Sequence, residues 1–151
     1  MSNTIQDFLA VSTLKGAADI AVALLRLPED RRTWSPAETS RTAMDMLAEC
    51  AINNGITADV IEARKWVGEP FDVYIQKKRD LAAQGWEVIE PLLKENTDRV
   101  VAVIKSVPGE ALAIEIETPY GTGPLSGIMS YPYWNMSYHE GQINYIASIL
   151  E

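Results

Sequence analysis

The sequence predicts an all-α protein, a four-helix bundle with a long crossover before its last helix. Several long stretches carry apolar residues at intervals of three and four, which is typical of helices that bury one face. Glycine and proline residues separate these stretches. Only the segment 111–118 alternates as a strand does, and one strand cannot make a sheet, so we interpret it as crossover. Helices that each bury one face favour a bundle.

The first helix is expected over Thr4 to Leu27. Its broad apolar face includes Ile5, Phe8 and Leu9, and the part from 17 to 25 is apolar almost all round. A helix that is apolar on every side is usually deeply packed, so we expect this part to lie inside the bundle.

The second helix has the clearest start signal, Ser35-Pro36-Ala37-Glu38. Ser35 can cap, Pro36 suits the first helical position and Glu38 completes a capping box. We expect this helix to end near Asn54, before Gly55, and a short helix to follow over 57–67. The core stripe of the second helix is Ala43, Met46, Leu47, Cys50 and Asn54.

The third helical stretch spans roughly 71–106, with a bend expected over 87–91 because of Gly85 and Pro91. The crossover follows, and the segment 121–124 has the composition of a turn. Pro124 can start the last helix, which runs to the C-terminus with a bend expected at Pro132.

The length and composition suit one globular domain over residues 1–151. The chain is 47% hydrophobic and 23% charged, without repeats or linkers. Its net charge of −8 disfavours nucleic acid and anionic membrane as partners, because both need a concentrated basic surface. We interpret the basic run Lys77-Lys78-Arg79 as the solvated face of a helix.

Cysteine use and the N-terminal residues predict a cytoplasmic protein. Cys50 is the single cysteine, so a disulfide within the chain and a cysteine-rich zinc site are excluded. The N-terminus lacks the basic region of a signal peptide. No run of about 18 apolar residues is present, so we expect no membrane span.

Candidate chemistry gathers on the last helix, around the single histidine. His139 falls on one stripe with Ile143, Ile146 and Leu150, while Asn135 lies one turn before it and Gln142 nearly one turn after. A buried polar group is costly unless it is paired. The pattern therefore predicts either a hydrogen-bonded core network or a site.

Several kinds of chemistry are open to this region. A metal ion would use His139 with Asn135, a weak amide ligand, and would need a carboxylate from another helix. General acid–base catalysis would pair His139 with a carboxylate such as Glu49, because Glu140 points about 100° away on a helix. Cys50 lies on a core stripe, which predicts an inert packing residue rather than a nucleophile.

The same region is rich in aromatic residues. They favour core packing or a dimer face, because tyrosine and tryptophan combine a large apolar area with a polar tip. The residues are Tyr131, Tyr133, Trp134, Tyr138 and Tyr145.

The segment Tyr138-His139-Glu140-Gly141-Gln142-Ile143 resembles the His-x-Gly-Gln-Ile signature near the end of the DinB/YfiT-like family. Leu27-Pro28, Trp34-Ser35-Pro36 and Leu47-Ala48-Glu49 resemble other parts of the family pattern. The resemblance extends along the whole chain and implies a DinB-like four-helix bundle. Family members are bacterial proteins, often dimers, and many bind a divalent metal.

The resemblance also implies where a metal would bind. The family uses three histidines, and the matching positions here are Glu49, Asn135 and His139, of which only His139 keeps the ligand type. The implied cofactor is a divalent transition metal, namely zinc, nickel, manganese or iron, or otherwise none.

Two functions are therefore expected from the resemblance. One is a divalent-metal-dependent hydrolase or thiol transferase acting on a small molecule. The alternative is a metal-free, non-catalytic bundle that binds a small molecule or is associated with stress, with the same residues in a structural hydrogen-bond network. Either would act as a homodimer.

Overall fold

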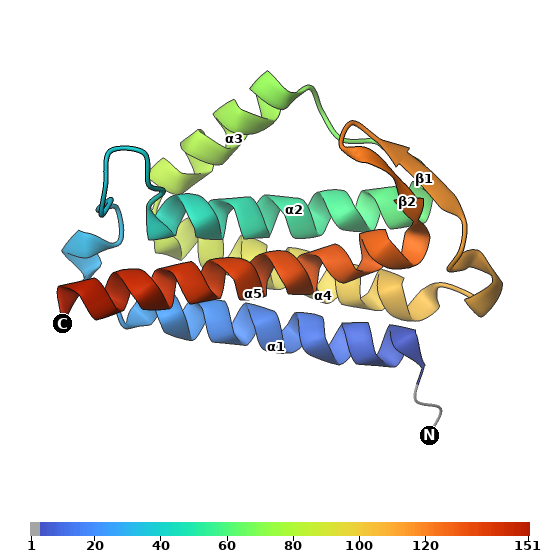
Figure 1. The fold of residues 1–151 in the computed structure, drawn as a ribbon, viewed down its shortest axis with the longest axis horizontal. Coiled ribbons are helices and arrows are strands. Elements are labelled where there is room, and N and C mark those ends of the chain that lie inside the picture. The colour runs from blue at the N-terminus through green and yellow to red at the C-terminus, as the bar shows by residue number, and fades with distance from the viewer. Residues whose placement is uncertain (1–3) are drawn as a thin grey trace.

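The computed structural model describes residues 4–151 as a helical bundle (Figure 1). Its long helices are α1 (Ile5–Leu25), α2 (Ala43–Ala63), α4 (Trp86–Ser106) and α5 (Leu125–Leu150). These helices lie side by side, with α2 packed against α4 and α5, and α1 packed against α5 and α4. The shorter α3 (Phe71–Ala83) leans on α2 and diverges from the bundle. The predicted all-α bundle is confirmed.

Helix α1 begins with a capping box formed by Thr4 and Asp7. One face, which includes Leu9, Ile20 and Leu24, is buried in the bundle. Val22 and Leu25 are exposed, so the prediction that this part is packed on all sides is wrong.

By length and composition, α1 is the one helix in the described residues that is apolar enough to cross a membrane. Of its apolar 18-residue window, 39% is buried inside the bundle. Core helices of globular proteins meet the same criterion.

Helix α2 begins later than the sequence signal indicates. Thr42 caps it by accepting a hydrogen bond from the Asp45 amide, at 3.2 Å. The predicted cap, Ser35, lies in the preceding loop, where its hydroxyl donates to the carbonyls of Ala37 and Ser40. These local bonds hold the loop in a compact non-helical shape.

Helix α2 also ends later than predicted, because Gly55 lies inside it. A Cβ atom at Gly55 would come within 2.9 Å of Asn96 Nδ2 on α4, and Asn96 donates to the carbonyl of Ala51 at 2.8 Å. Gly55 therefore lets α4 approach closely and does not stop the helix. The separate helix predicted over 57–67 is the last part of α2, which continues to Ala63.

The predicted helical stretch over 71–106 is two helices. The break is at Gly85, whose φ of 89° is readily adopted only by glycine, and not over 87–91 as predicted. Pro91 lies inside α4, near its start.

The crossover contains a small hairpin. The strand β1 (Glu115–Thr118) pairs antiparallel with β2 (Gly121–Pro124), with Glu115 opposite Pro124. The extended segment predicted from the alternation is confirmed over 115–118. The prediction that it has no partner strand is wrong, because the glycine-rich segment 121–124 pairs with it. Helix α5 then runs as one helix through Pro132 to Leu150.

Candidate functional site

The structure brings Glu49 of α2 and His139 of α5 into direct contact. The Nε2 atom of His139 lies 2.9 Å from Oε1 of Glu49. His139 is almost fully buried, on the same face of α5 as Met136 and Ile143, while Glu49 lies at the edge of the buried face of α2. This position lets the Glu49 carboxylate reach both the buried histidine and the solvent side of the helix pair.

Gln142 holds the other side of the imidazole ring, with Oε1 at 2.6 Å from Nδ1 of His139. A protonated ring donates a hydrogen bond to both partners. A neutral ring donates from Nε2 to Glu49 and accepts at Nδ1 from the Gln142 amide, whose oxygen and nitrogen are assigned by their partners. In both cases, the two ring nitrogens are engaged within the protein.

Two basic side chains complete the network around Glu49. Arg41 Nη2 lies 2.8 Å from Glu49 Oε2, and Arg41 Nε lies 2.5 Å from Asp45 Oδ2. Lys78 Nζ lies 3.6 Å from Glu49 Oε2 and 3.4 Å from Asp45 Oδ1. The two carboxylates and two cations balance one another in a partly buried cluster.

Lys78 and Arg41 are the residues that sequence reasoning missed. Lys78 is buried, so the prediction of a solvated basic face is wrong at this position. A signal existed, because Tyr74, Lys78 and Leu81 follow helical spacing and Lys78 shares the inward stripe of α3 with Leu81. Arg41 directly precedes the cap Thr42, and its spacing of four residues to Asp45 is the signal that could have indicated the ion pair.

The charge of Glu49 is strongly fixed by these partners. Burial alone would raise the pKa of this carboxyl, but the hydrogen bond with His139 and the charge of Arg41 outweigh burial and lower the pKa to about 2. Glu49 is therefore an ionised hydrogen-bond acceptor at neutral pH.

Asn135 takes no part in the contact between Glu49 and His139. Its Nδ2 atom lies 3.7 Å from Sγ of Cys50, and both residues are buried. Cys50 is fully buried in the hydrophobic core, which confirms the prediction of a packing residue. Burial also raises the pKa of its thiol, which favours the protonated form. The third position implied by the family resemblance thus belongs to a neighbouring buried contact.

The arrangement does not fit a divalent cation. Over residues 4–151, no cluster of at least three His, Cys, Asp or Glu side chains is placed to hold a metal. Glu49 already faces the cations Arg41 and Lys78, whose charges would repel a metal ion, and His139 has both nitrogens engaged. The donor set implied for zinc, nickel, manganese or iron is therefore not assembled.

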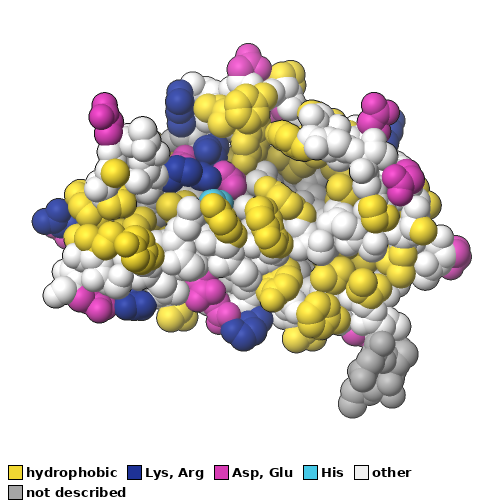
Figure 2. Space-filling model, in the orientation of Figure 1, with side chains coloured by type: hydrophobic (Ala, Val, Ile, Leu, Met, Phe, Trp, Pro, Cys, Tyr) yellow, Lys and Arg dark blue, Asp and Glu magenta, His cyan; other side chains and the backbone are white. Residues whose placement is uncertain are grey.

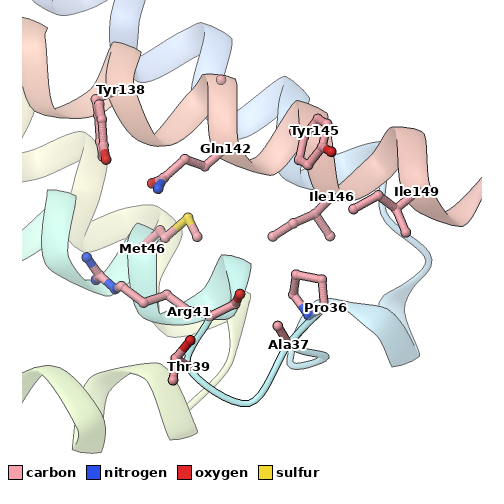
Figure 3. Close-up of a pocket in the computed structure, with 12 residues that line it drawn as sticks. Pro36, Ala37, Thr39, Arg41, Met46, Tyr138, Gln142, Tyr145, Ile146 and Ile149 are labelled. Carbon is pink, nitrogen blue, oxygen red and sulfur yellow. The ribbon is translucent and has the colours of Figure 1, made fainter.

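An open groove lies beside the network, between α5, the start of α2 and the loop before it (Figure 3). Its volume is about 790 Å³. Arg41 and Gln142 line this groove, and they are the same side chains that contact Glu49 and His139. The remaining lining residues are Pro36, Ala37, Thr39, Ser40, Met46, Tyr138, Gly141, Tyr145, Ile146 and Ile149.

The aromatic residues of α5 lie more on the surface than the core interpretation suggests. Trp134, Tyr138 and Tyr145 are each more than half exposed. Trp134 stacks on Tyr138 with ring centroids 5.5 Å apart, and Tyr131 lies 5.8 Å from Trp134. This row continues into the wall of the groove at Tyr138.

Comparison with solved structures finds the same architecture in YjoA, a DinB-like protein from Bacillus subtilis. The TM-score is 0.68, and the match covers 94% of this chain and 90% of that chain. The chain has a DinB-like fold. The two sequences are 17% identical, so the similarity concerns the DinB-like fold alone. No family model and no curated protein matches the chain.

Proposed function

We propose that this DinB-like bundle is a metal-free, non-catalytic binding protein for a small organic molecule. The observation that carries the proposal is that Arg41 and Gln142 belong both to the groove and to the network around Glu49 and His139. A ligand in the groove would contact side chains that are already held in place, which lowers the entropic cost of binding. The network would then act as a support for the groove.

The chemistry of the groove indicates the class of ligand. Its walls are mostly apolar, with Tyr145, Ile146 and Ile149 from α5 facing Pro36 and Ala37 of the loop (Figure 3). Gln142 of α5 and Arg41 at the start of α2 extend from opposite walls, and their polar ends lie at the same end of the groove, near Tyr138 (Figure 3). A guanidinium and an amide both retain donors beyond the bonds described above. The ligand we propose has an apolar body and an anionic or hydrogen-bond-accepting end.

The alternative, a metal-dependent hydrolase or thiol transferase, is supported by the family resemblance. The local chemistry gives it less support. The cations beside Glu49 disfavour a metal, and the buried, protonated thiol of Cys50 is not an available nucleophile. The binding function needs neither group.

A pair of fluorescent probes tests the binding proposal. The dye 8-anilinonaphthalene-1-sulfonate carries an apolar body and an anionic end, whereas N-phenyl-1-naphthylamine lacks the sulfonate. We expect saturable binding of the sulfonate dye that weakens about fivefold, or about 1 kcal/mol, in both Gln142→Ala and Tyr145→Ser. The neutral dye should bind more weakly to the wild-type protein and should not respond to Gln142→Ala.

The matched control is Tyr120→Ser, because Tyr120 is also a highly exposed tyrosine but lies outside the groove. It should bind the sulfonate dye as the wild type does. Equal binding by the wild type, Tyr145→Ser and Gln142→Ala would place the dye elsewhere and overturn the assignment of the groove.

A further inference from the structure

The buried core of the bundle is divided into two separate clusters. One cluster includes Ile20 of α1 and Met46 of α2, which also lines the groove. The other cluster includes Leu9 of α1 and Ile116 of the hairpin strand β1. We call the two parts of the bundle that contain them the groove half and the hairpin half. Each of the four long helices contributes residues to both clusters, so the boundary between the halves crosses all four helices.

Polar side chains occupy this boundary. Thr13 of α1, Asn54 of α2 and Thr97 of α4 are buried, and each lies on its helix between residues of the two clusters. Asn54 Nδ2 donates to Thr97 Oγ1 at 3.0 Å and lies 3.5 Å from Sδ of Met136 on α5. A Cβ atom at Gly16, about one turn after Thr13, would lie 3.4 Å from Cβ of Met136. The three polar residues therefore form one layer across the bundle, which we call the polar layer.

The polar layer is only partly paired. Among the described residues, Thr13 Oγ1 and Asn54 Oδ1 are buried without a hydrogen-bond partner. An unpaired buried polar atom raises the free energy of the closed structure, and it gains a hydrogen bond to water when the structure around it opens. The layer therefore lowers the free energy needed to separate the two halves.

The helices themselves are weakened at the same level. Pro132 of α5 is buried and lies between Met129 of the hairpin half and Met136 of the groove half. Proline has no amide hydrogen, so α5 lacks one backbone hydrogen bond there. Gly16 of α1 and Gly55 of α2 add no apolar side chain to the core at this level. Few apolar groups therefore link the two clusters.

The two halves are held together unequally. In the groove half, Glu49 contacts His139 and Lys78, which ties α2 to α5 and α3. Figure 2 shows basic, acidic and histidine side chains gathered between α3 and α5. In the hairpin half, the ion pair of Arg99 with Asp59 joins α4 to α2 but is exposed, and exposed ion pairs contribute little to stability. Over the described residues, the groove half also has the larger buried cluster.

We propose that the polar layer is a boundary for local unfolding, at which the hairpin half opens and closes while the groove half stays folded. Proteins open in contiguous units whose stabilities differ, and a layer of poorly paired polar groups separates two such units here. The opening needs no ligand, so this property is separate from the proposed binding function.

Native-state hydrogen exchange of the full chain, read by mass spectrometry at increasing urea concentration, tests the boundary. Amides of the hairpin half should exchange at least about tenfold faster than amides of the groove half. Their exchange should also depend less on urea than global unfolding does, because a local opening exposes less surface. Equal protection and equal urea dependence in the two halves would overturn the proposal.

Variants in each half show whether the halves open separately. His139→Asn should accelerate exchange only in the groove half, because His139 stays in place when the hairpin half opens. Gln142→Ala is a milder change in the same half, and it should give the same pattern even if His139→Asn does not fold. Ile116→Val should accelerate both halves, because buried Ile116 is exposed by the local opening and by global unfolding. Acceleration of both halves by Gln142→Ala would indicate one cooperative bundle and contradict the boundary.

Thr13→Val tests the part played by the polar layer itself. Valine has the shape of threonine without the hydroxyl, so removal of the unpaired group should slow exchange about threefold in both halves. The matched control Thr122→Val makes the same change at an exposed position of β2 and should leave exchange unchanged. Faster exchange in Thr13→Val would show that the hydroxyl stabilises the closed layer, which would overturn its assignment as the boundary.

Discussion

Glu49 is a carboxylate surrounded by groups that donate hydrogen bonds or carry positive charge. His139 approaches it from α5, Arg41 approaches from the loop before α2, and Lys78 approaches from α3. In the family pattern, a metal ligand is expected at this position, and a metal brings its own positive charge. Here side chains of the protein supply positive charge, so the partly buried carboxylate is balanced within the chain.

The lowered pKa of Glu49 predicts a specific dependence of stability on pH. The pKa is about 2 in the folded protein, below the usual value of 4.5. The stabilisation by ionised Glu49 is therefore fully present above about pH 4.5 and is lost as the pH falls toward about 2. Its size is on the order of 3 kcal/mol. Urea unfolding of the wild type and Glu49→Gln should differ most near neutrality and converge toward about pH 2. A difference that stays constant over this range would contradict the lowered pKa.

The sequence predicts part of this site and misses the rest for a physical reason. The contact between His139 and Glu49 is anticipated because helical spacing turns the histidine inward and the resemblance aligns the glutamate. Arg41 and Lys78 are missed because a charged residue is solvated unless a partner from another element desolvates it. Such a partner depends on how α2 and α3 pack, which spacing within one helix does not show.

The start of α2 illustrates competition between two local signals. Ser35-Pro36-Ala37-Glu38 has the composition of a helix start, yet the Ser35 hydroxyl bonds to loop carbonyls and Thr42 caps the helix. The capped start places Arg41 immediately before the helix, where it can reach Asp45 and Glu49. The shape of the loop is thus linked directly to the site.

Substitution of the two candidate caps distinguishes these signals. Thr42→Ala should lower the free energy of unfolding by about 1 kcal/mol, because it leaves the Asp45 amide without its acceptor. Ser35→Ala should have a smaller effect, since Ser35 donates only to carbonyls within the loop and caps no helix. Chemical denaturation measures both. A larger loss of unfolding free energy in Ser35→Ala than in Thr42→Ala would instead support a helix that starts at Ser35.

Glycine is an unreliable predictor of helix ends in this chain. The chain breaks between α3 and α4 at one glycine, but α2 continues through another. Gly85 ends a helix because of its positive φ, whereas Gly55 sits in mid-helix because Asn96 approaches it closely. The two glycines have similar local sequence contexts in that both follow polar residues. Tertiary packing decides between the two roles. The sequence therefore indicates that a glycine has a structural role, but it does not show whether the glycine breaks a helix or allows a close helix contact.

At the scale of the whole molecule, the bundle follows from the apolar periodicity, and the comparison with YjoA supports the same DinB-like fold. The hairpin of the crossover was missed because β2 consists of Gly, Thr, Gly and Pro, which are typical of turns. The family resemblance implies metal ligands at Glu49, Asn135 and His139, where this chain has one histidine. The proposed consequence is a bundle in which an internal ion network takes the place of the metal.

The most direct test of this consequence is the metal content of the protein, purified without a histidine tag and compared with His139→Asn. We expect less than about 0.1 atom of zinc, nickel, manganese or iron per chain, and no stabilisation by added metal that depends on His139. The variant should still unfold more easily, by about 1 to 3 kcal/mol, because Glu49 and Gln142 lose their shared partner. Near-stoichiometric metal in the wild type that disappears in His139→Asn would contradict the metal-free network and favour the metal-dependent enzyme.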